Sequence, residues 1–147
     1  MIENHITKEA IWLECLADNK RELLRIIAEK ASHLTGLSQY TLLEGFTSRE
    51  ALQSTAMGKG IAVPHCVLND YDDIFCGFVR TQDPIDFDSK DLKPADLYFF
   101  IISSADRGTD HLRVLAKASR LLRDEDIRTK LRLAQNEKVI LELLTQS

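Results

Sequence analysis

One short apolar run limits the folds open to this chain more than any other feature. Residues 97–102 read Leu-Tyr-Phe-Phe-Ile-Ile, with no charged side chain to mark a solvent-facing side. A strand of this composition is buried on both faces, so it belongs inside a sheet that helices cover from both sides. The run predicts a central strand over about 96–103.

The rest of the chain supplies further strands and two long helices. Strands are expected at 11–16, briefly at 61–63, at 74–81 and, after a turn at Asp83-Pro84, at 85–87 as a short edge strand. The first helix begins after Asn19, with Glu22 placed for a capping box, and ends at Gly36. The second begins near Ser38, and Thr47 and Ser48 are alternative points at which it restarts.

Three helices are expected after the central strand. Asp106, Thr109 and Asp110 are alternative caps for the first of them, which ends near Asp124, and two shorter helices follow. We therefore predict a single α/β domain, 1–147, with a mixed sheet of about five strands and helices packed on both faces. Its core is expected to span about 11–144, with His5 in a frayed terminus.

Composition excludes several function classes. The net charge of −4, without a basic stripe, argues against a nucleic-acid partner. No apolar run approaches membrane-spanning length and no leader-like segment opens the chain, so neither membrane insertion nor secretion is expected. Three cysteines without a paired spacing predict reduced thiols and a cytoplasmic location.

The segment from Leu43 to Leu68 is organised around one histidine. Pro64 fixes its own φ and restricts the residue before it, so His65 follows a stiff piece of backbone. Two glycines bracket Lys59 and leave room for a tight turn. A rigidly held imidazole beside a permissive turn is suited to chemistry.

The same segment resembles the enzyme IIA domains of the mannitol and fructose class of the bacterial phosphoenolpyruvate-dependent phosphotransferase system. The resemblance rests on Arg49-Glu50, Ser54-Thr55 and the run Gly58-x-Gly60-Ile61-Ala62-Val63-Pro64-His65, and extends to Pro84-Ile85-Asp86-Phe87 and Asp110-His111-Leu112. It covers about 11–144, and the overall pattern is most similar to the stand-alone nitrogen-regulatory IIA proteins.

The resemblance implies a phosphohistidine carrier. His65 would accept a phosphoryl group on Nε2 from an HPr-like carrier, with His111 and Arg49 flanking the group, and would pass it to a IIB domain or signal to a regulated target protein. Phosphoryl transfer needs fixed donors around the phosphoryl oxygens. The other candidate donors or partner contacts are Ser54, Thr55, Lys59, Gly60 and Cys66. No metal and no cofactor are expected.

One departure from the family pattern keeps two alternatives open. Glycine usually follows the active histidine, whereas this chain has Cys66. If that position needs a positive φ, the cysteine is strained there and its side chain lies at the partner-facing rim. A regulatory binding module with little phosphoryl transfer is one alternative. A thiol-dependent or metal-dependent protein that uses Cys66 with a histidine is the other.

Overall fold

The predicted central strand is β6, Ala95–Ser104, and it is buried along almost its whole length. The structure is a computed structural model that describes residues 1–146. Alternate side chains of β6 enter two separate cores: Leu97, Phe99 and Ile101 point into one, while Tyr98, Phe100 and Ile102 point into the other. The expectation of a strand covered on both faces is confirmed.

A mixed sheet surrounds this strand. Across residues 1–146 it has six strands in the order β1-β5-β6-β3-β2, and β4 joins β6 on the same side as β3. The strands are β1 Ile6–Cys15, β2 Ala56–Gly58, β3 Ile61–Ala62, β4 His65–Leu68, β5 Ile74–Ile85 and β6. β5 and β6 are antiparallel, whereas β1 runs parallel to β5, and β3 and β4 run parallel to β6.

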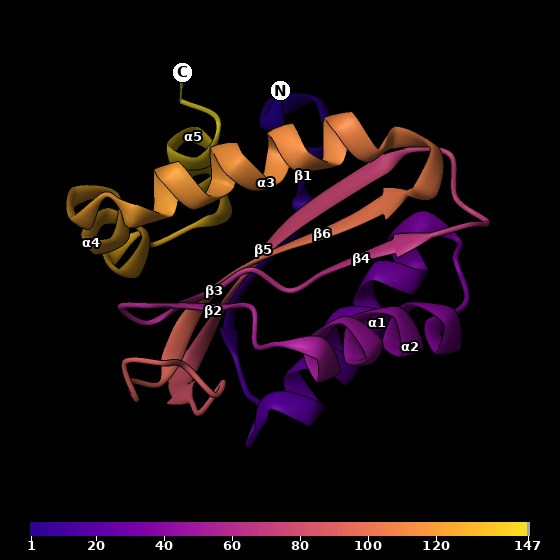
Figure 1. Ribbon diagram of the computed structural model, residues 1–147. Helices are drawn as coiled ribbons and strands as arrows, with labels where there is room; N and C mark the ends of the chain where they lie inside the picture. Colours follow the sequence, from indigo (N-terminus) through magenta and orange to yellow (C-terminus); the bar gives the residue numbers. More distant parts are fainter. Residues whose placement is uncertain (147) are drawn as a thin grey trace.

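Helices form a layer on each face of the sheet (Figure 1). One layer is the pair α1, Lys20–Thr35, and α2, Gln39–Leu52. The other is α3, Gly108–Arg123, with α4, Glu125–Leu133, and α5, Glu137–Leu144. The predicted fold class is confirmed, with one strand more than expected.

The predicted beginnings of the first two helices and the predicted end of the first are confirmed. Asn19 accepts a hydrogen bond from the Glu22 amide, and Ser38 accepts one from the Thr41 amide. Gly36 ends α1 with a left-handed φ of 78°. The suggested restart of the second helix is wrong, because α2 is continuous and the Thr47 hydroxyl bonds back to the carbonyl of Leu43.

The amino terminus differs from its prediction. The strand expected at 11–16 begins at Ile6, after a 3-10 turn, Ile2–Asn4. The amide of Cys76 donates to the carbonyl of His5 at 2.9 Å, and Ile2 is fully buried. The expected fraying at His5 is therefore wrong, and the core extends beyond the predicted limit. Most side chains of residues 6–10 are polar and exposed, which hid the strand from its pattern.

Two other boundaries were also wrong. Asp83-Pro84 is not a turn between strands: β5 continues to Ile85, and a register shift after Arg80 accommodates the proline. None of the three predicted caps begins α3. A 3-10 turn, Ala105–Arg107, leads directly into the helix, and Asp110 pairs with Arg107 instead.

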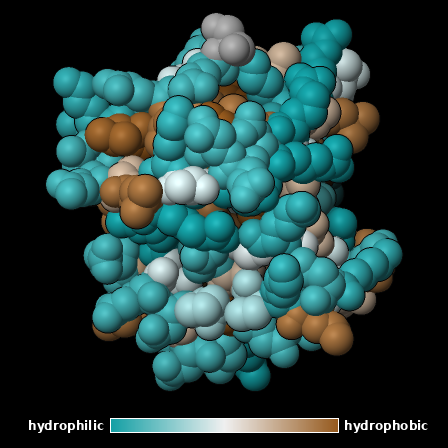
Figure 2. Space-filling view, turned by 90° about the vertical axis from the view of Figure 1, so that its left-hand side faces the viewer, coloured by the Kyte–Doolittle hydropathy of each residue, from teal (hydrophilic) through white to brown (hydrophobic). Residues whose placement is uncertain are grey.

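The side of the molecule near α4 and the β2–β3 turn is mostly hydrophilic, with separated hydrophobic spots (Figure 2). Leu92 and Leu133 are among the exposed leucines of the chain.

Within residues 1–146, none of the helices has the length and apolar character needed to span a bilayer.

Candidate active site

A proline break in the sheet places His65. Residues 61–68 run beside β6 as two short strands, β3 and β4, separated by Val63 and Pro64. Pro64 has no N–H to donate, but its carbonyl accepts a bond from the amide of Ile101 at 3.0 Å. His65 is thus the first residue of β4, held in register opposite Ile101.

The imidazole of His65 has one nitrogen fixed and one available. Nδ1 lies 2.8 Å from the carbonyl oxygen of Val63. Because a carbonyl only accepts, Nδ1 must carry the proton, and Nε2 keeps its lone pair. Arg49 donates from Nε to that nitrogen at 3.2 Å.

The surroundings of His65 favour the neutral ring. Burial lowers the pKa of His65 below its ordinary value, the Val63 carbonyl raises the pKa in part, and the positive charge of Arg49 lowers it again. At neutral pH the ring therefore presents an unprotonated Nε2, which is the form that a nucleophile requires.

Arg49 reaches the histidine from the last turn of α2. Its Nη1 donates to the carbonyl of Gln53, the residue after the helix, at 2.6 Å. This bond orients the guanidinium while Nε contacts His65. A planar group with several donors held in this way suits the oxygens of a phosphoryl group.

His111 approaches from the opposite helix layer. It lies in the first turns of α3, and its ring centroid is 5.4 Å from that of His65, with 51° between the planes. The side chain is 6% exposed, and its Nδ1 is hydrogen-bonded to the hydroxyl of Ser103. Burial, and secondarily the charge of His65, lower the pKa of His111. The structure thus brings the three principal predicted residues together.

A buried carboxylate next to Arg49 was missed as a functional residue. Glu50 accepts from the amide and the hydroxyl of Thr55 and pairs with Lys20 at 2.8 Å. The Thr55 carbonyl in turn accepts from the amide of Val63 at 3.1 Å. Glu50 thereby supports the backbone that fixes Nδ1 of His65. No local signal predicts this chain of contacts, because Lys20 and Val63 are far from Glu50 in sequence.

The other predicted donors divide into two groups. Ser54 and Thr55 lie beside the site, but their hydroxyls are bonded to Phe87 and Glu50 respectively. Lys59 and Gly60 lie at the tip of the β2–β3 turn. Gly60 is five residues before His65 along an extended segment, or roughly 16 Å at the rise of a strand, and Lys59 is one residue further.

That turn has its own anchors, away from the histidines. Lys59 has a φ of 59°, its amide donates to Asp91 at 2.8 Å, and its carbonyl accepts from Arg132 at 3.1 Å. Gly60 has a φ of 85°, a backbone conformation that L side chains rarely adopt, and this is why glycine is needed there; a Cβ would also lie 2.3 Å from the guanidinium of Arg132. The structure does not bring these two residues to His65.

Cys66 does not lie where the sequence placed it. Its φ is outside the left-handed region, because the residue belongs to the regular strand β4. Its side chain is 2% exposed and packs under Gly45 of α2, so the expected position at the partner-facing rim is wrong. Burial raises the pKa of the thiol to about 12. A protonated, enclosed thiol is a poor nucleophile and metal ligand, which weakens the thiol-dependent alternative.

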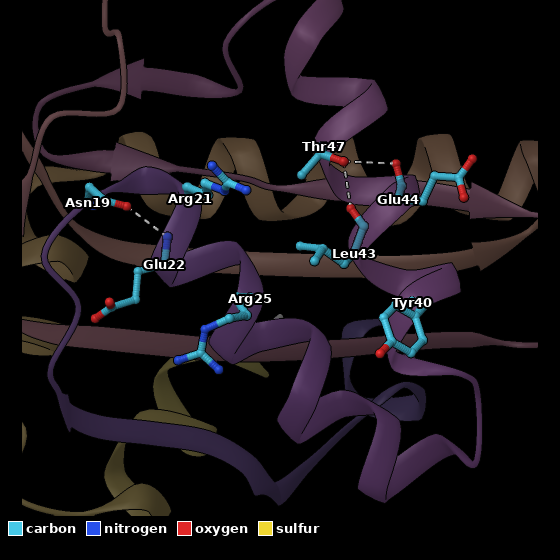
Figure 3. Close-up of a pocket in the computed structure, with 8 residues that line it drawn as sticks. All are labelled: Asn19, Arg21, Glu22, Arg25, Tyr40, Leu43, Glu44 and Thr47. Carbon is cyan, nitrogen blue, oxygen red and sulfur yellow. Dashed lines mark hydrogen bonds between the residues drawn. The ribbon is translucent and has the colours of Figure 1, made fainter.

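A groove of about 770 Å³ lies between α1 and α2, apart from this site (Figure 3). It is lined by Asn19, Arg21, Glu22, Arg25, Tyr40, Leu43, Glu44 and Thr47. Tyr40 is 85% exposed, and the charges of the two arginines are balanced by two glutamates. His65, Arg49 and His111 do not belong to this lining.

Comparison with known proteins agrees with the fold and with the sequence resemblance. Residues 4–147 match the family model described as phosphoenolpyruvate-dependent sugar phosphotransferase system, EIIA 2. A nitrogen regulatory protein of Bradyrhizobium diazoefficiens is 39% identical over 143 residues, covering 97% of this chain and 94% of the relative.

Two solved structures have the same fold. The crystal structure of nitrogen regulatory protein IIA-Ntr from Neisseria meningitidis superposes with a TM-score of 0.95 at 27% identity, covering 98% of this chain and 99% of that one. The complex of the mannitol enzyme IIA with phosphorylated enzyme IIB from Escherichia coli gives a TM-score of 0.77 at 23% identity, covering 92% and 94% of the two chains.

Proposed function

The chain belongs to the EIIA 2 family of the phosphoenolpyruvate-dependent sugar phosphotransferase system, and from this premise we propose that it is a phosphohistidine carrier whose phosphorylated residue is His65. The observation that carries the proposal is the fixed lone pair on Nε2, with Nδ1–H held by Val63 and the Arg49 guanidinium beside it. The donor is an HPr-like carrier that bears a phosphohistidine of its own.

The transfer exchanges one nitrogen–phosphorus bond for another. Nε2 of His65 attacks the phosphorus, the bond to the donor's histidine breaks, and the donor nitrogen keeps the electron pair. Arg49 and His111 donate hydrogen bonds to the phosphoryl oxygens while the phosphoryl group passes from the donor's histidine to His65. The Arg49 Nε–H must shift from Nε2 to a phosphoryl oxygen as the lone pair attacks, and this shift is short because both side chains already lie at the nucleophile.

The proton on Nδ1 assists the later release of the phosphoryl group from His65. With Nδ1–H still bonded to the Val63 carbonyl, the phosphorylated ring carries a positive charge. That ring departs as a neutral imidazole when the phosphoryl group moves on, so it is a good leaving group. Holding this proton is the role we assign to the supporting contacts of Glu50, Thr55 and Val63.

We place the chain in the nitrogen-regulatory branch, acting in the cytoplasm. The support is the 39% identity to a nitrogen regulatory protein over nearly the full length of both chains. Phosphorylation adds close to two negative charges next to His65, enough to change how a target protein docks there. Regulation then depends on the fraction of the protein that is phosphorylated.

The test of the carrier function is incubation with phosphoenolpyruvate, enzyme I and an HPr-like carrier, followed by intact mass spectrometry. The protein should gain one acid-labile phosphoryl group, and His65→Ala should gain none. His33→Ala is the matched control, since His33 lies exposed on α1, and it should be phosphorylated normally. Absence of any gain with a carrier active on a known IIA protein would favour the regulatory binding module.

A second candidate function is a sugar-specific IIA that passes the group to a IIB domain. It is favoured by the likeness in fold to the mannitol enzyme IIA that was solved with phosphorylated enzyme IIB. Labelled phosphoprotein mixed with IIB domains of the mannitol and fructose systems separates the two. Rapid transfer of the label to a IIB domain supports the sugar branch, and retention on His65 supports the regulatory one.

A further inference from the structure

The side chain behind His111 is a fully buried serine. Ser103 lies near the end of β6 and is 0% exposed. Its hydroxyl is hydrogen-bonded to Nδ1 of His111, and no other partner of this hydroxyl is found in residues 1–146. The contact joins the central strand to the first turns of α3.

The backbone fixes where this hydroxyl lies. Ser103 is paired with Ile74 of β5 on one side and with Val67 of β4 on the other. A residue in the interior of a sheet, held from two sides, moves little. The serine is therefore a stable reference point for the His111 ring.

Counting protons in the Ser103–His111 pair assigns the tautomer of His111. If Nδ1 carried the proton, it would donate to the serine oxygen, and the buried hydroxyl hydrogen would have no acceptor among the described residues. If Nδ1 is unprotonated, the serine donates to it and both groups are satisfied. Buried hydroxyls without an acceptor are disfavoured, so the second arrangement is the stable one.

The His111 ring has only one N–H to place. Burial and the neighbouring His65 lower the pKa of His111, so the ring is neutral at neutral pH. A neutral imidazole with an unprotonated Nδ1 carries its hydrogen on Nε2. That N–H belongs to a ring whose centroid is 5.4 Å from the ring of His65.

We propose that Ser103 is a positioning residue that holds His111 in the Nε2–H tautomer, so that His111 donates a hydrogen bond to the phosphoryl group carried by His65. The donor role rests on the proposed function, whereas the tautomer does not. In the opposite tautomer, the lone pair on Nε2 would face the phosphoryl oxygens and repel them.

Long-range ¹H–¹⁵N correlation spectra of the unphosphorylated protein test the tautomer directly. His111 should show a protonated Nε2 and an unprotonated Nδ1 in the wild type, and Ser103→Ala should lose this pattern in favour of a mixture. Ser104→Ala is the matched control: Ser104 is the next residue on β6, is also buried, and its hydroxyl accepts from the Asp106 amide rather than contacting His111. The His111 signals should be unchanged in this control.

The rate of phosphoryl acceptance tests the donor role. Ser103→Ala should accept the group roughly 10-fold more slowly than the wild type, a smaller loss than removing a donor outright. Ser103→Thr retains the hydroxyl and should restore both the tautomer and the rate. If the alanine variant does not fold, Ser103→Cys removes the strong donor with little change in volume and should give the same two effects.

Several outcomes would overturn the proposal. A protonated Nδ1 in the wild type, or an unchanged tautomer in Ser103→Ala, would remove the positioning role. A changed tautomer with a wild-type rate would remove the donor role. A wild-type protein that takes no phosphoryl group but shows the Nε2–H tautomer would count against the proposed function, while the assignment of Ser103 as the tautomer-setting residue would stand.

Discussion

At the scale of single residues, the site depends on which nitrogen of each ring carries a proton. His65 is fixed by a carbonyl, which only accepts, and His111 contacts a hydroxyl, which can do either. The sequence predicted that both histidines belong to the site. The partner of each second nitrogen was not, because Val63 offers a backbone group and Ser103 has no pattern of its own.

The charge and the shape of Arg49 make separable contributions. Arg49→Gln removes the positive charge that lowers the pKa of His65, so we expect this pKa to rise and phosphoryl acceptance to fall by roughly 10²–10³-fold. Arg49→Lys retains the charge without the planar fork. It should leave the pKa of His65 close to that of the wild type while still slowing acceptance. NMR titration of His65 measures the pKa, and the rate of mass gain measures phosphoryl acceptance. Equal pKa values of His65 in both variants would show that the charge of Arg49 does not lower this pKa.

Stability should depend on pH through the two histidines. Burial lowers the pKa of both rings from the ordinary 6.5, so below that pH the unfolded chain binds more protons than the folded one. The free energy of unfolding should therefore decrease as pH falls from about 6.5 through the folded pKa values. Urea unfolding at about pH 7.5 and about pH 5.5 measures the decrease. His65→Gln should show a smaller one; an equal decrease in that variant would contradict the role of His65.

At the scale of elements, the close approach of α2 to β4 positions Arg49. Gly45 lies one helical turn before Arg49, and Cys66 follows His65, so two successive contacts join the helix to the strand. A Cβ on Gly45 would lie 3.0 Å from the Cβ of Cys66 and 3.2 Å from Leu68. The glycine is explained by this spacing, which hydrophobic periodicity could not reveal.

A larger side chain at position 45 should therefore weaken both packing and activity. Gly45→Val is expected to lower the free energy of unfolding by about 1–3 kcal/mol, because Cys66 and Leu68 must shift. It should also slow phosphoryl acceptance, since Arg49 moves with α2. Ser48→Val is the control: Ser48 is an exposed residue of the same helix, and its replacement introduces the same β-branched side chain without the contact. Urea unfolding with equal losses in both variants would rule out the spacing argument.

Boundaries of elements were predicted well only where a local interaction sets them. The side-chain oxygens of Asn19 and Ser38 cap their helices by accepting hydrogen bonds from the amides three residues later. Contacts over so short a separation can be predicted from sequence. The beginning of α3 was not predicted, because a 3-10 turn replaces the cap. The pair Asp83-Pro84 predicts a turn from sequence, whereas β5 continues through it, because a register shift that tolerates proline depends on the partner strand.

At the scale of the whole molecule, the site is where the two helix layers meet an edge of the sheet. α2 brings Arg49 from one layer, α3 brings His111 from the other, and β4 lies between them with His65 (Figure 1). Composition and periodicity predicted the layers. They could not predict this meeting, because it depends on β4 running parallel to β6 and on α3 folding back after β6; only the family resemblance indicated it.

The amino terminus closes the α3 layer, and this can be tested on Ile2. Its side chain is fully buried in the same core as Val114 and Ala118 of α3. Because a cavity forms when it is truncated, Ile2→Ala should lower the free energy of unfolding by about 2–5 kcal/mol. Leu16→Ala, a similar truncation at a residue that is 67% exposed, should cost less than about 0.5 kcal/mol. Similar midpoints in urea for both variants would mean that residues 1–5 contribute little to the core.

Because Ile2 supports α3, and α3 holds His111, we also expect Ile2→Ala to slow phosphoryl acceptance under conditions where the protein is still folded.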